Sequence, residues 1–210
     1  MPISDKYKCI FIHIPKNAGS SIEIALDMFR HDYQRPHLDA LFGRLGNRNM
    51  QHMTAIELSR RQDLLPEYKF RTYFKFAFVR NPWERVVSDY LSWSTNLGRS
   101  PFDKFVENMY RSPHLQKTQY QYVYDRSGNC LVDFIGRHEN LEKDWEFVSR
   151  YIGCRKCLPR YNKASEAKPL KLGYLHYSKY YDEVISEIVR KKFKKDIEFF
   201  NYTFKKEDKL

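Results

Sequence analysis

A short loop of small and basic residues is the first part of the chain that could do chemistry. From Pro15 to Ser21 it reads Pro-Lys-Asn-Ala-Gly-Ser-Ser, between an apolar segment and a segment with helical spacing. Small residues let backbone N–H groups approach an anion closely, and the first turn of a helix adds unpaired N–H donors and partial positive charge. Lys16 adds an ammonium group, and Ser20 and Ser21 add hydroxyl donors. The loop predicts a pocket for a phosphate or sulfate group, with an ordinary strand-to-helix turn as the alternative.

The order of residues in this loop differs from the common ATP-binding arrangement. The Walker A motif starts with glycine and ends in Gly-Lys-Ser or Gly-Lys-Thr, so its lysine comes late. In this chain Lys16 comes early, and no glycine starts the loop. A Mg²⁺-dependent kinase or nucleoside triphosphatase therefore remains only as an alternative.

A second segment combines arginine with hydroxyl side chains and reads Arg-Asn-Pro-Trp-Glu-Arg-Val-Val-Ser-Asp-Tyr from Arg80 onward. Arg80 follows an apolar run, where its guanidinium group can form two parallel hydrogen bonds with a phosphate. Ser88 comes about two helical turns later, on the side that can meet the same anion. We expect Arg85 to have a structural role instead, paired with Glu84 or Asp89 on the helix surface or with the edge of the sheet.

Apolar spacing predicts the elements that position these two segments. It predicts strands over Lys8–Ile14, Tyr73–Val79 and Cys130–Ile135, and helices over Thr54–Arg61, Phe102–Tyr110, Leu141–Ile152 and Ser178–Phe199, besides one that starts at Ser20 or Ser21 and one that Pro82 opens. In the last helix, Val184, Ile188 and Ile197 are expected on one apolar side, and Asp32–Asn49 is predicted to be a loop. Strands that alternate with helices predict an α/β fold with a mainly parallel sheet, in which ligands bind beyond the carboxyl ends of the strands.

Charge and composition indicate which partners and which kinds of site to expect. Lys and Arg total 37 against 26 Asp and Glu among 210 residues, so the net charge is +11, which suits polyanionic partners. The sequence contains no run of about 18 apolar residues and no signal-peptide pattern, so a cytoplasmic protein without a membrane span is predicted. The cysteines are Cys9, Cys130, Cys154 and Cys157, and only the last two have metal-like spacing. They are interpreted as reduced structural thiols, and no metal site is predicted.

The two segments together resemble a known enzyme family. The stretch Ile-His-Ile-Pro-Lys-Asn-Ala-Gly-Ser-Ser resembles the 5′-phosphosulfate-binding loop of sulfotransferases that use 3′-phosphoadenosine-5′-phosphosulfate (PAPS), of the Golgi carbohydrate and bacterial type. Their usual form is close to Pro-Lys-Thr-Ala-Gly-Thr-Ser. The segment that begins at Arg80 is similar to the family's 3′-phosphate-binding segment, Arg-Asp/Asn-Pro-x-x-Arg-x-x-Ser-x-Tyr. The stretches Ile135–Leu141, Leu158–Lys163 and Asp196–Tyr202 are also similar to parts of these enzymes.

This resemblance implies a P-loop-like three-layer fold, with a central mainly parallel sheet flanked by helices, over a single domain of residues 1–210. It implies PAPS as the co-substrate, held by Lys16, Asn17, Ala18, Gly19, Ser20, Ser21, Arg80, Ser88 and Arg137. The stretches 30–50 and 92–118 align with nothing in the family, and acceptor contacts are expected there.

The implied reaction transfers a sulfuryl group to an acceptor hydroxyl, on a carbohydrate that can be acidic, and releases adenosine 3′,5′-bisphosphate. Lys16 fits the stabilisation of the leaving group, and no metal is required. His52 is predicted as the base, because related enzymes carry a histidine in a similar stretch and imidazole suits proton transfer near neutral pH. His13 is interpreted as a packed core residue, and the weaker candidates for the base are Glu23, Glu57, His31, Asp32 and His37. A non-enzymatic module that binds polyanions is the further alternative, and nucleic acid is not the expected partner.

Overall fold

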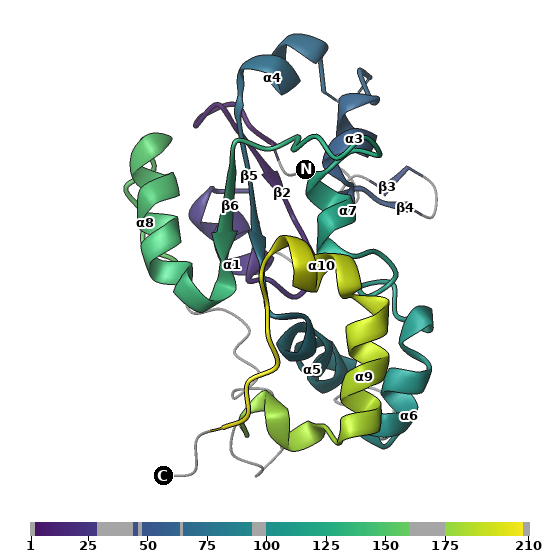
Figure 1. Cartoon of the computed structure of the whole chain (residues 1–210). Helices are drawn as coiled ribbons and strands as arrows, with labels where there is room; N and C mark the ends of the chain where they lie inside the picture. Colours follow the sequence, from purple (N-terminus) through teal and green to yellow (C-terminus); the bar gives the residue numbers. More distant parts are fainter. Residues whose placement is uncertain are drawn as a thin grey trace. The chain divides into compact units, whose positions relative to one another are not determined.

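The chain forms two compact units, and Figure 1 traces both. The computed structural model describes residues 3–28, 44–45, 48–63, 65–93, 100–159 and 175–207. The first unit consists of Met1–Val79 and Gln121–Tyr161, and the second consists of Arg80–Tyr120 and Asn162–Leu210. Each unit has its own cluster of buried apolar side chains.

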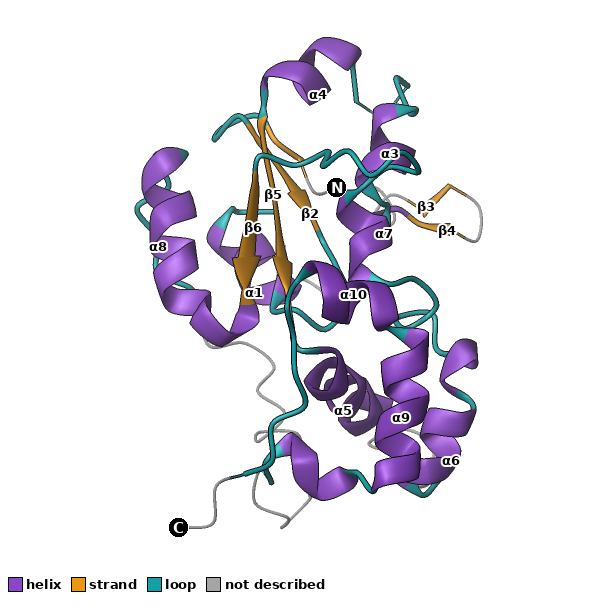
Figure 2. Cartoon of the chain, viewed as in Figure 1, coloured by secondary structure: helices purple, strands orange, loops and turns teal. Residues whose placement is uncertain are grey.

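Short strands and helices build the first unit (Figure 2). They are β1 (Ile3–Ser4), β2 (Cys9–Ile12), α1 (Gly19–Ala25), β3 (Arg44–Leu45), β4 (Arg48–Asn49), α3 (Ala55–Ser59), α4 (Glu67–Thr72), β5 (Phe74–Val79), β6 (Phe134–Arg137) and α8 (Leu141–Tyr151), with 3₁₀ turns at Met50–His52 and His138–Asn140. Helix α7 (Gln119–Val123) begins in the second unit and ends in the first. The strands β3 and β4 pair with each other inside the stretch that the sequence assigned to a loop, whose residues 32–43 lie outside the described part.

The main sheet is four-stranded, in the order β1-β2-β5-β6. Strands β2, β5 and β6 are parallel, and β1 is antiparallel to β2, which confirms the α/β class and the mainly parallel sheet. Ile12 pairs with Ala77, and Val79 pairs with Arg137. The carboxyl ends of the three parallel strands therefore lie at one edge of the sheet, as Figure 2 shows.

The third parallel strand starts later than the sequence predicted. Cys130 forms a bridge with Tyr124, and the Leu131 N–H donates to the carbonyl oxygen of Val123, so this apolar run pairs with its own preceding segment first. The strand proper begins at Phe134, where pairing with β5 takes over. The prediction of Cys130–Ile135 identified the strand but placed it about four residues early.

Aromatic rings fill one face of the sheet. Phe11 and Phe76 stack with ring centroids 5.2 Å apart, and Phe76 meets Phe78 edge-on at 6.3 Å. Side chains of α1 and α8, among them Ile22 and Trp145, pack against this face. Each fully buried ring of this kind contributes roughly 1.5–3 kcal/mol through the hydrophobic effect, so this layer stabilises the packing of β2 against β5.

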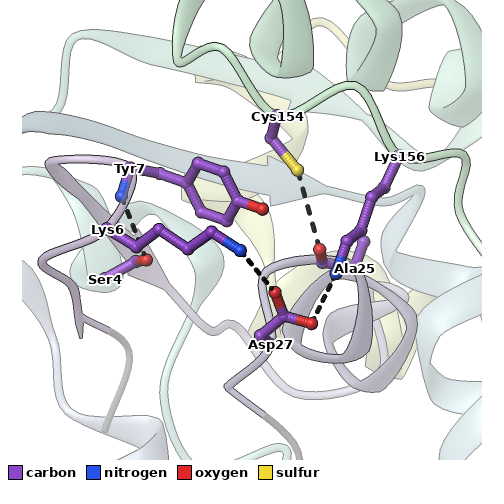
Figure 3. Close-up of polar contacts among 7 residues, drawn as sticks. All are labelled: Ser4, Lys6, Tyr7, Ala25, Asp27, Cys154 and Lys156. Atoms are coloured by element: carbon purple, nitrogen blue, oxygen red, sulfur yellow. Dashed lines mark hydrogen bonds and ion pairs between the residues drawn. The ribbon is translucent and has the colours of Figure 1, made fainter.

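Side chains from two distant segments hold the carboxyl end of α1 in place (Figure 3). Asp27, just after the helix, has a φ of 58° and accepts hydrogen bonds from Lys6 and Lys156. These bonds lower the pKa of the Asp27 carboxyl, the one from Lys156 contributing most. The Cys154 thiol donates to the carbonyl oxygen of Ala25 at 3.6 Å. The predicted anion-binding loop leads directly into α1. The helix that follows this loop is therefore anchored at its carboxyl end.

Helices dominate the second unit. They are α5 (Pro82–Trp93), α6 (Phe102–Glu107), α9 (Glu183–Lys192) and α10 (Lys194–Phe199), with 3₁₀ turns at Met109–Arg111 and Tyr177–Tyr180. Trp83, Val86 and Val87 are buried on α5, and they pack with Ile185 and Val189 of α9. None of the helices within the described ranges is both long and apolar enough to cross a membrane.

The segment Ser178–Phe199, predicted as one helix, contains two helices, α9 and α10. The buried side of α9 differs from the predicted side. Asp182 is the N-cap of α9, because its side chain accepts a hydrogen bond from the Ile185 N–H at 2.7 Å, so the helix begins at Glu183. Ile185 is then 7% exposed and Val184 is 68% exposed, which makes the prediction that Val184 faces inward wrong. Phe193 separates α9 from α10 and is buried.

The four free thiols differ in burial, which predicts their reactivity. Cys9 and Cys154 are buried, and Cys130 and Cys157 are exposed. Burial, with a smaller contribution from Cys154, raises the pKa of the Cys9 thiol from 9.0 to about 12. Because the thiolate is the reactive form, we expect Ellman's reagent to titrate the two exposed thiols in the native protein and all four in denaturant.

The raised pKa of Cys9 also predicts a pH effect on stability. Below pH 9 the thiol is protonated in both the folded and the unfolded chain, and between pH 9 and pH 12 ionisation favours the unfolded chain. The free energy of unfolding should fall over that window, and by less in Cys9→Ala, as urea denaturation would show. Equal falls in both proteins, or reaction of all four native thiols, would contradict this burial.

Candidate functional site

The loop between β2 and α1 has an unusual backbone. Lys16 has a φ of 73° and Ala18 a φ of 64°, although neither is glycine. Each such residue is strained by roughly 1–2 kcal/mol, and strain of this kind gathers at functional sites. Left-handed residues alternating with others, here separated by Asn17, turn successive N–H groups toward a common point, the arrangement called a nest that binds anions. This backbone supports the interpretation of the loop as a phosphate or sulfate pocket.

Asn17 fixes this loop to the sheet. Its side chain is buried, and its Nδ2 donates to the carbonyl oxygen of Phe78 at 2.7 Å. Phe78 lies near the carboxyl end of β5, and Arg80 follows two residues later in the chain. The Asn17 side chain therefore has a positioning role, and its backbone N–H is the group suited to an anion.

The rest of the loop is packed closely around His13. A Cβ atom on Gly19 would lie 1.9 Å from His13 Nε2, so only glycine fits there. Helix α1 begins at Gly19 with Ala18 as its N-cap, one or two residues before the predicted start at Ser20 or Ser21. Ser21 is buried and Ser20 is half-buried. Because α1 has only 7 residues, the positive field at this loop comes mainly from Lys16 and the first N–H groups.

His52 lies beside this loop, in the 3₁₀ turn after β4. Its Nδ1 is 3.3 Å from the carbonyl oxygen of His13, and the two rings meet edge-on with centroids 4.7 Å apart. A carbonyl oxygen only accepts hydrogen bonds, so Nδ1 carries the proton and Nε2 has the lone pair when the ring is neutral. In this tautomer Nε2 is the nitrogen that can accept a proton.

The other candidates for the base already have structural partners. His13 is buried and hydrogen-bonded to Glu23, which confirms its interpretation as a core residue. Glu57 and Thr54 form a capping box at the start of α3, within the helix predicted over Thr54–Arg61. The remaining candidates, His31, Asp32 and His37, lie outside the described residues.

In the second unit, neighbouring side chains form hydrogen bonds with both the backbone and the side chain of Arg80. Gln119 accepts from the Arg80 N–H and donates to the Arg80 carbonyl oxygen, both at 2.8 Å. The guanidinium Nη2 of Arg80 donates to Glu84 at 2.7 Å, and Ser88 follows one helical turn later on the same face of α5. The backbone and the guanidinium group of Arg80 are therefore preorganised, with Ser88 on the adjoining surface.

Arg85 has the structural role that we expected, but its recorded partners differ from those predicted. It is 1% exposed and donates to the carbonyl oxygens of His114 and Lys117. Glu84, which the sequence paired with Arg85, bonds Arg80 instead. Arg85 thus anchors the segment before α7.

Arg137 ends β6, level with Val79 of β5. Its N–H donates to the Asp144 carboxylate at 2.6 Å, and its side chain is half-buried. Arg137 and the loop that contains Lys16 therefore both belong to the edge of the sheet where the parallel strands end.

Two polar clusters of the second unit were not predicted. Asp196 is fully buried and accepts hydrogen bonds from the backbone N–H groups of Gln119 and Tyr120. These bonds fix the start of α7. Burial raises the pKa of the Asp196 carboxyl. Asp89, also fully buried, accepts a hydrogen bond from His114 Nδ1 at 2.6 Å. His114 lies in the stretch 92–118 that resembles nothing in the family, so no sequence signal marked it.

The described residues contain no group of three or more His, Cys, Asp or Glu side chains that could hold a metal ion. Cys154 and Cys157, the pair with metal-like spacing, are both free thiols, one buried and one exposed. Lys16, Arg80 and Arg137 are the positively charged side chains of the predicted set, and each lies within the described residues.

Comparison with known proteins identifies relatives over most of the chain. The model of the sulfotransferase family matches residues 1–203. Carbohydrate sulfotransferase 14 of Homo sapiens is 27% identical over 181 residues, which cover 71% of this chain and 46% of that protein. Carbohydrate sulfotransferase 11 of Rattus norvegicus is 27% identical over 157 residues, 56% of this chain and 44% of that protein. An uncharacterized protein of Archaeoglobus fulgidus is 40% identical over 87 residues, 40% of this chain and 71% of that protein.

The chain spans about half the length of the carbohydrate sulfotransferases that it matches. No solved structure matches it. The family model covers almost the whole chain, including both segments on which the resemblance was based. The protein belongs to the sulfotransferase family.

Proposed function

We propose that this protein transfers a sulfuryl group from PAPS to a hydroxyl group of a carbohydrate. The observation that carries the proposal is the strained loop of Lys16 and Ala18, fixed by Asn17 to the end of β5, where the chain continues directly into Arg80. The family match supports sulfuryl transfer, and the names of the relatives support a carbohydrate acceptor. The proposed architecture is a P-loop-like three-layer fold, which the mainly parallel sheet supports.

The donor nucleotide has two anionic ends that suit the two segments. We assign the 5′-phosphosulfate to the N–H groups of the loop, to Lys16 and to the serine hydroxyls. We assign the 3′-phosphate to Arg80 and Ser88, because Gln119 holds the Arg80 backbone and Glu84 holds its guanidinium group, so little conformational entropy is lost when this arginine binds a phosphate. Arg137, at the same edge of the sheet as the loop, is the further nucleotide contact.

The reaction needs a base, an in-line arrangement and stabilisation of the leaving group. The acceptor oxygen forms a bond to sulfur while the bond between sulfur and the 5′-phosphate oxygen breaks. His52 Nε2 takes the proton of the acceptor hydroxyl, since Nδ1 already carries a proton toward His13. The Lys16 ammonium and the loop N–H groups stabilise the charge that develops on the leaving phosphate.

The 3′-phosphate is the first feature to test. We expect isothermal titration to show tight binding of adenosine 3′,5′-bisphosphate and binding of ADP weaker by about tenfold or more, because ADP lacks the 3′-phosphate. Lys16→Ala and Arg80→Ala should each weaken the bisphosphate by roughly 1.5–3 kcal/mol, the value of a charged hydrogen bond. Equal affinity for ADP would contradict the assignment of Arg80 and Ser88 and favour a nucleoside triphosphatase or kinase.

His52 is tested by separating turnover from binding. We expect His52→Ala to lower the turnover of a carbohydrate acceptor about a hundredfold or more, the usual effect of losing a general base. The affinity for adenosine 3′,5′-bisphosphate should stay within about threefold, since no nucleotide contact is assigned to His52. His176→Ala, which removes a histidine from the cap of a 3₁₀ turn, is the control and should keep full turnover. Unchanged turnover in His52→Ala would exclude this residue as the base. Absence of turnover in the unmodified protein would favour a polyanion-binding module instead.

A further inference from the structure

The residues that contact or precede the proposed base are hydrogen-bonded to a buried carboxylate. Glu23 of α1 is 4% exposed, and both of its oxygens accept hydrogen bonds. One bond comes from His13 Nδ1 and the other from Gln51 Nε2, each at 2.7 Å. Glutamate is almost never buried unless it is paired, because loss of hydration strongly disfavours its charged form. A buried position for this group therefore needs a reason beyond packing.

Both partners of Glu23 touch or adjoin His52. The His13 carbonyl oxygen is 3.3 Å from His52 Nδ1, and the His13 ring lies against the His52 ring at 4.7 Å. Gln51 precedes His52 in the same 3₁₀ turn. Two independent paths thus lead from the carboxylate of Glu23 to the His52 ring, one through His13 and one through the backbone of the turn.

The opposite edge of the His13 ring is equally constrained. His13 Nε2 faces Gly19 so closely that no Cβ atom fits between them, and the ring stacks on Phe11 with centroids 5.5 Å apart. The ring therefore cannot move away from His52 without disturbing the anion-binding loop or the core. A hydrogen bond to Glu23 holds it in this one orientation.

We propose that Glu23 is a positioning residue which, through His13 and Gln51, fixes the orientation and the tautomer of His52. This inference rests on the proposed function, in which His52 is the base. Glu23 itself does not touch the substrate in this account. Its carboxylate keeps the proton of His52 on Nδ1, so that Nε2 is ready to accept the proton of the hydroxyl group.

Kinetics of Glu23→Gln test the proposal. This change keeps the volume of the side chain, but it replaces one carboxylate oxygen with an NH₂ group, which cannot accept the hydrogen bond that His13 or Gln51 donates. We expect kcat to fall about tenfold or more, as expected when a base loses the carboxylate that orients it. The KM for the acceptor and the Kd for adenosine 3′,5′-bisphosphate should stay within about threefold. Glu107→Gln is the control, because this half-exposed carboxylate pairs with Lys104 on the surface of α6, and it should leave all three quantities unchanged.

A double-mutant cycle shows whether Glu23 acts through His52. In a His52→Ala background, Glu23→Gln should change kcat by less than about twofold, because the group that it positions is already absent. A full tenfold loss in that background would overturn the proposal. Gln51→Ala, at a half-buried position that tolerates change more easily, should lower kcat in the same direction by a smaller factor.

Nitrogen NMR of the histidine rings tests the proposal without any activity. The ring ¹⁵N chemical shifts of His52 should report a single tautomer, protonated at Nδ1, in the unmodified protein and a mixture of tautomers in Glu23→Gln. Identical His52 shifts in the two proteins would overturn the proposal, even if sulfuryl transfer is confirmed. If the unmodified protein transfers no sulfuryl group from PAPS, the proposed function fails, and the NMR result still decides whether Glu23 positions His52.

Discussion

The hydrogen bond from the Asn17 side chain to the carbonyl oxygen of Phe78 is the contact on which the proposed site depends. The loop that follows β2 contains two strained residues, Lys16 and Ala18, and a strained backbone persists only where its surroundings hold it. A buried amide bonded to the neighbouring parallel strand provides such support. The same contact places the loop beside the end of β5, from which the chain runs into Arg80.

His52 and His114 follow one physical pattern. A buried or backbone oxygen accepts a hydrogen bond from Nδ1 of a histidine and so decides where the ring proton lies. The His13 carbonyl does this for His52, and the carboxylate of Asp89 does it for His114. Such preorganisation suits a reaction in which the protein contributes orientation and charge and forms no covalent bond with the substrate.

The sequence predicted the local features better than the distant ones. The parallel strands were predictable because strands buried on both faces are continuous apolar runs, and the loop from Pro15 to Ser21 was recognisable because its residues are adjacent. The bonds between Gln119 and Arg80 join groups 39 positions apart, which no local pattern encodes. The error at Val184 had a local cause, because the cap formed by Asp182 shifted the buried side of the helix by one residue.

We propose that the loop held by Asn17 binds the 5′-phosphate end of the nucleotide. It is tested most directly by titrating Asn17→Ala with two nucleotides, adenosine 3′,5′-bisphosphate and adenosine 3′-monophosphate, which lacks the 5′-phosphate. We expect affinity for the bisphosphate to fall about tenfold, the loss expected when a preorganised charged contact is weakened by about 1.4 kcal/mol. Affinity for the 3′-monophosphate should not change. Equal losses for both nucleotides, or no loss for either, would contradict the claim.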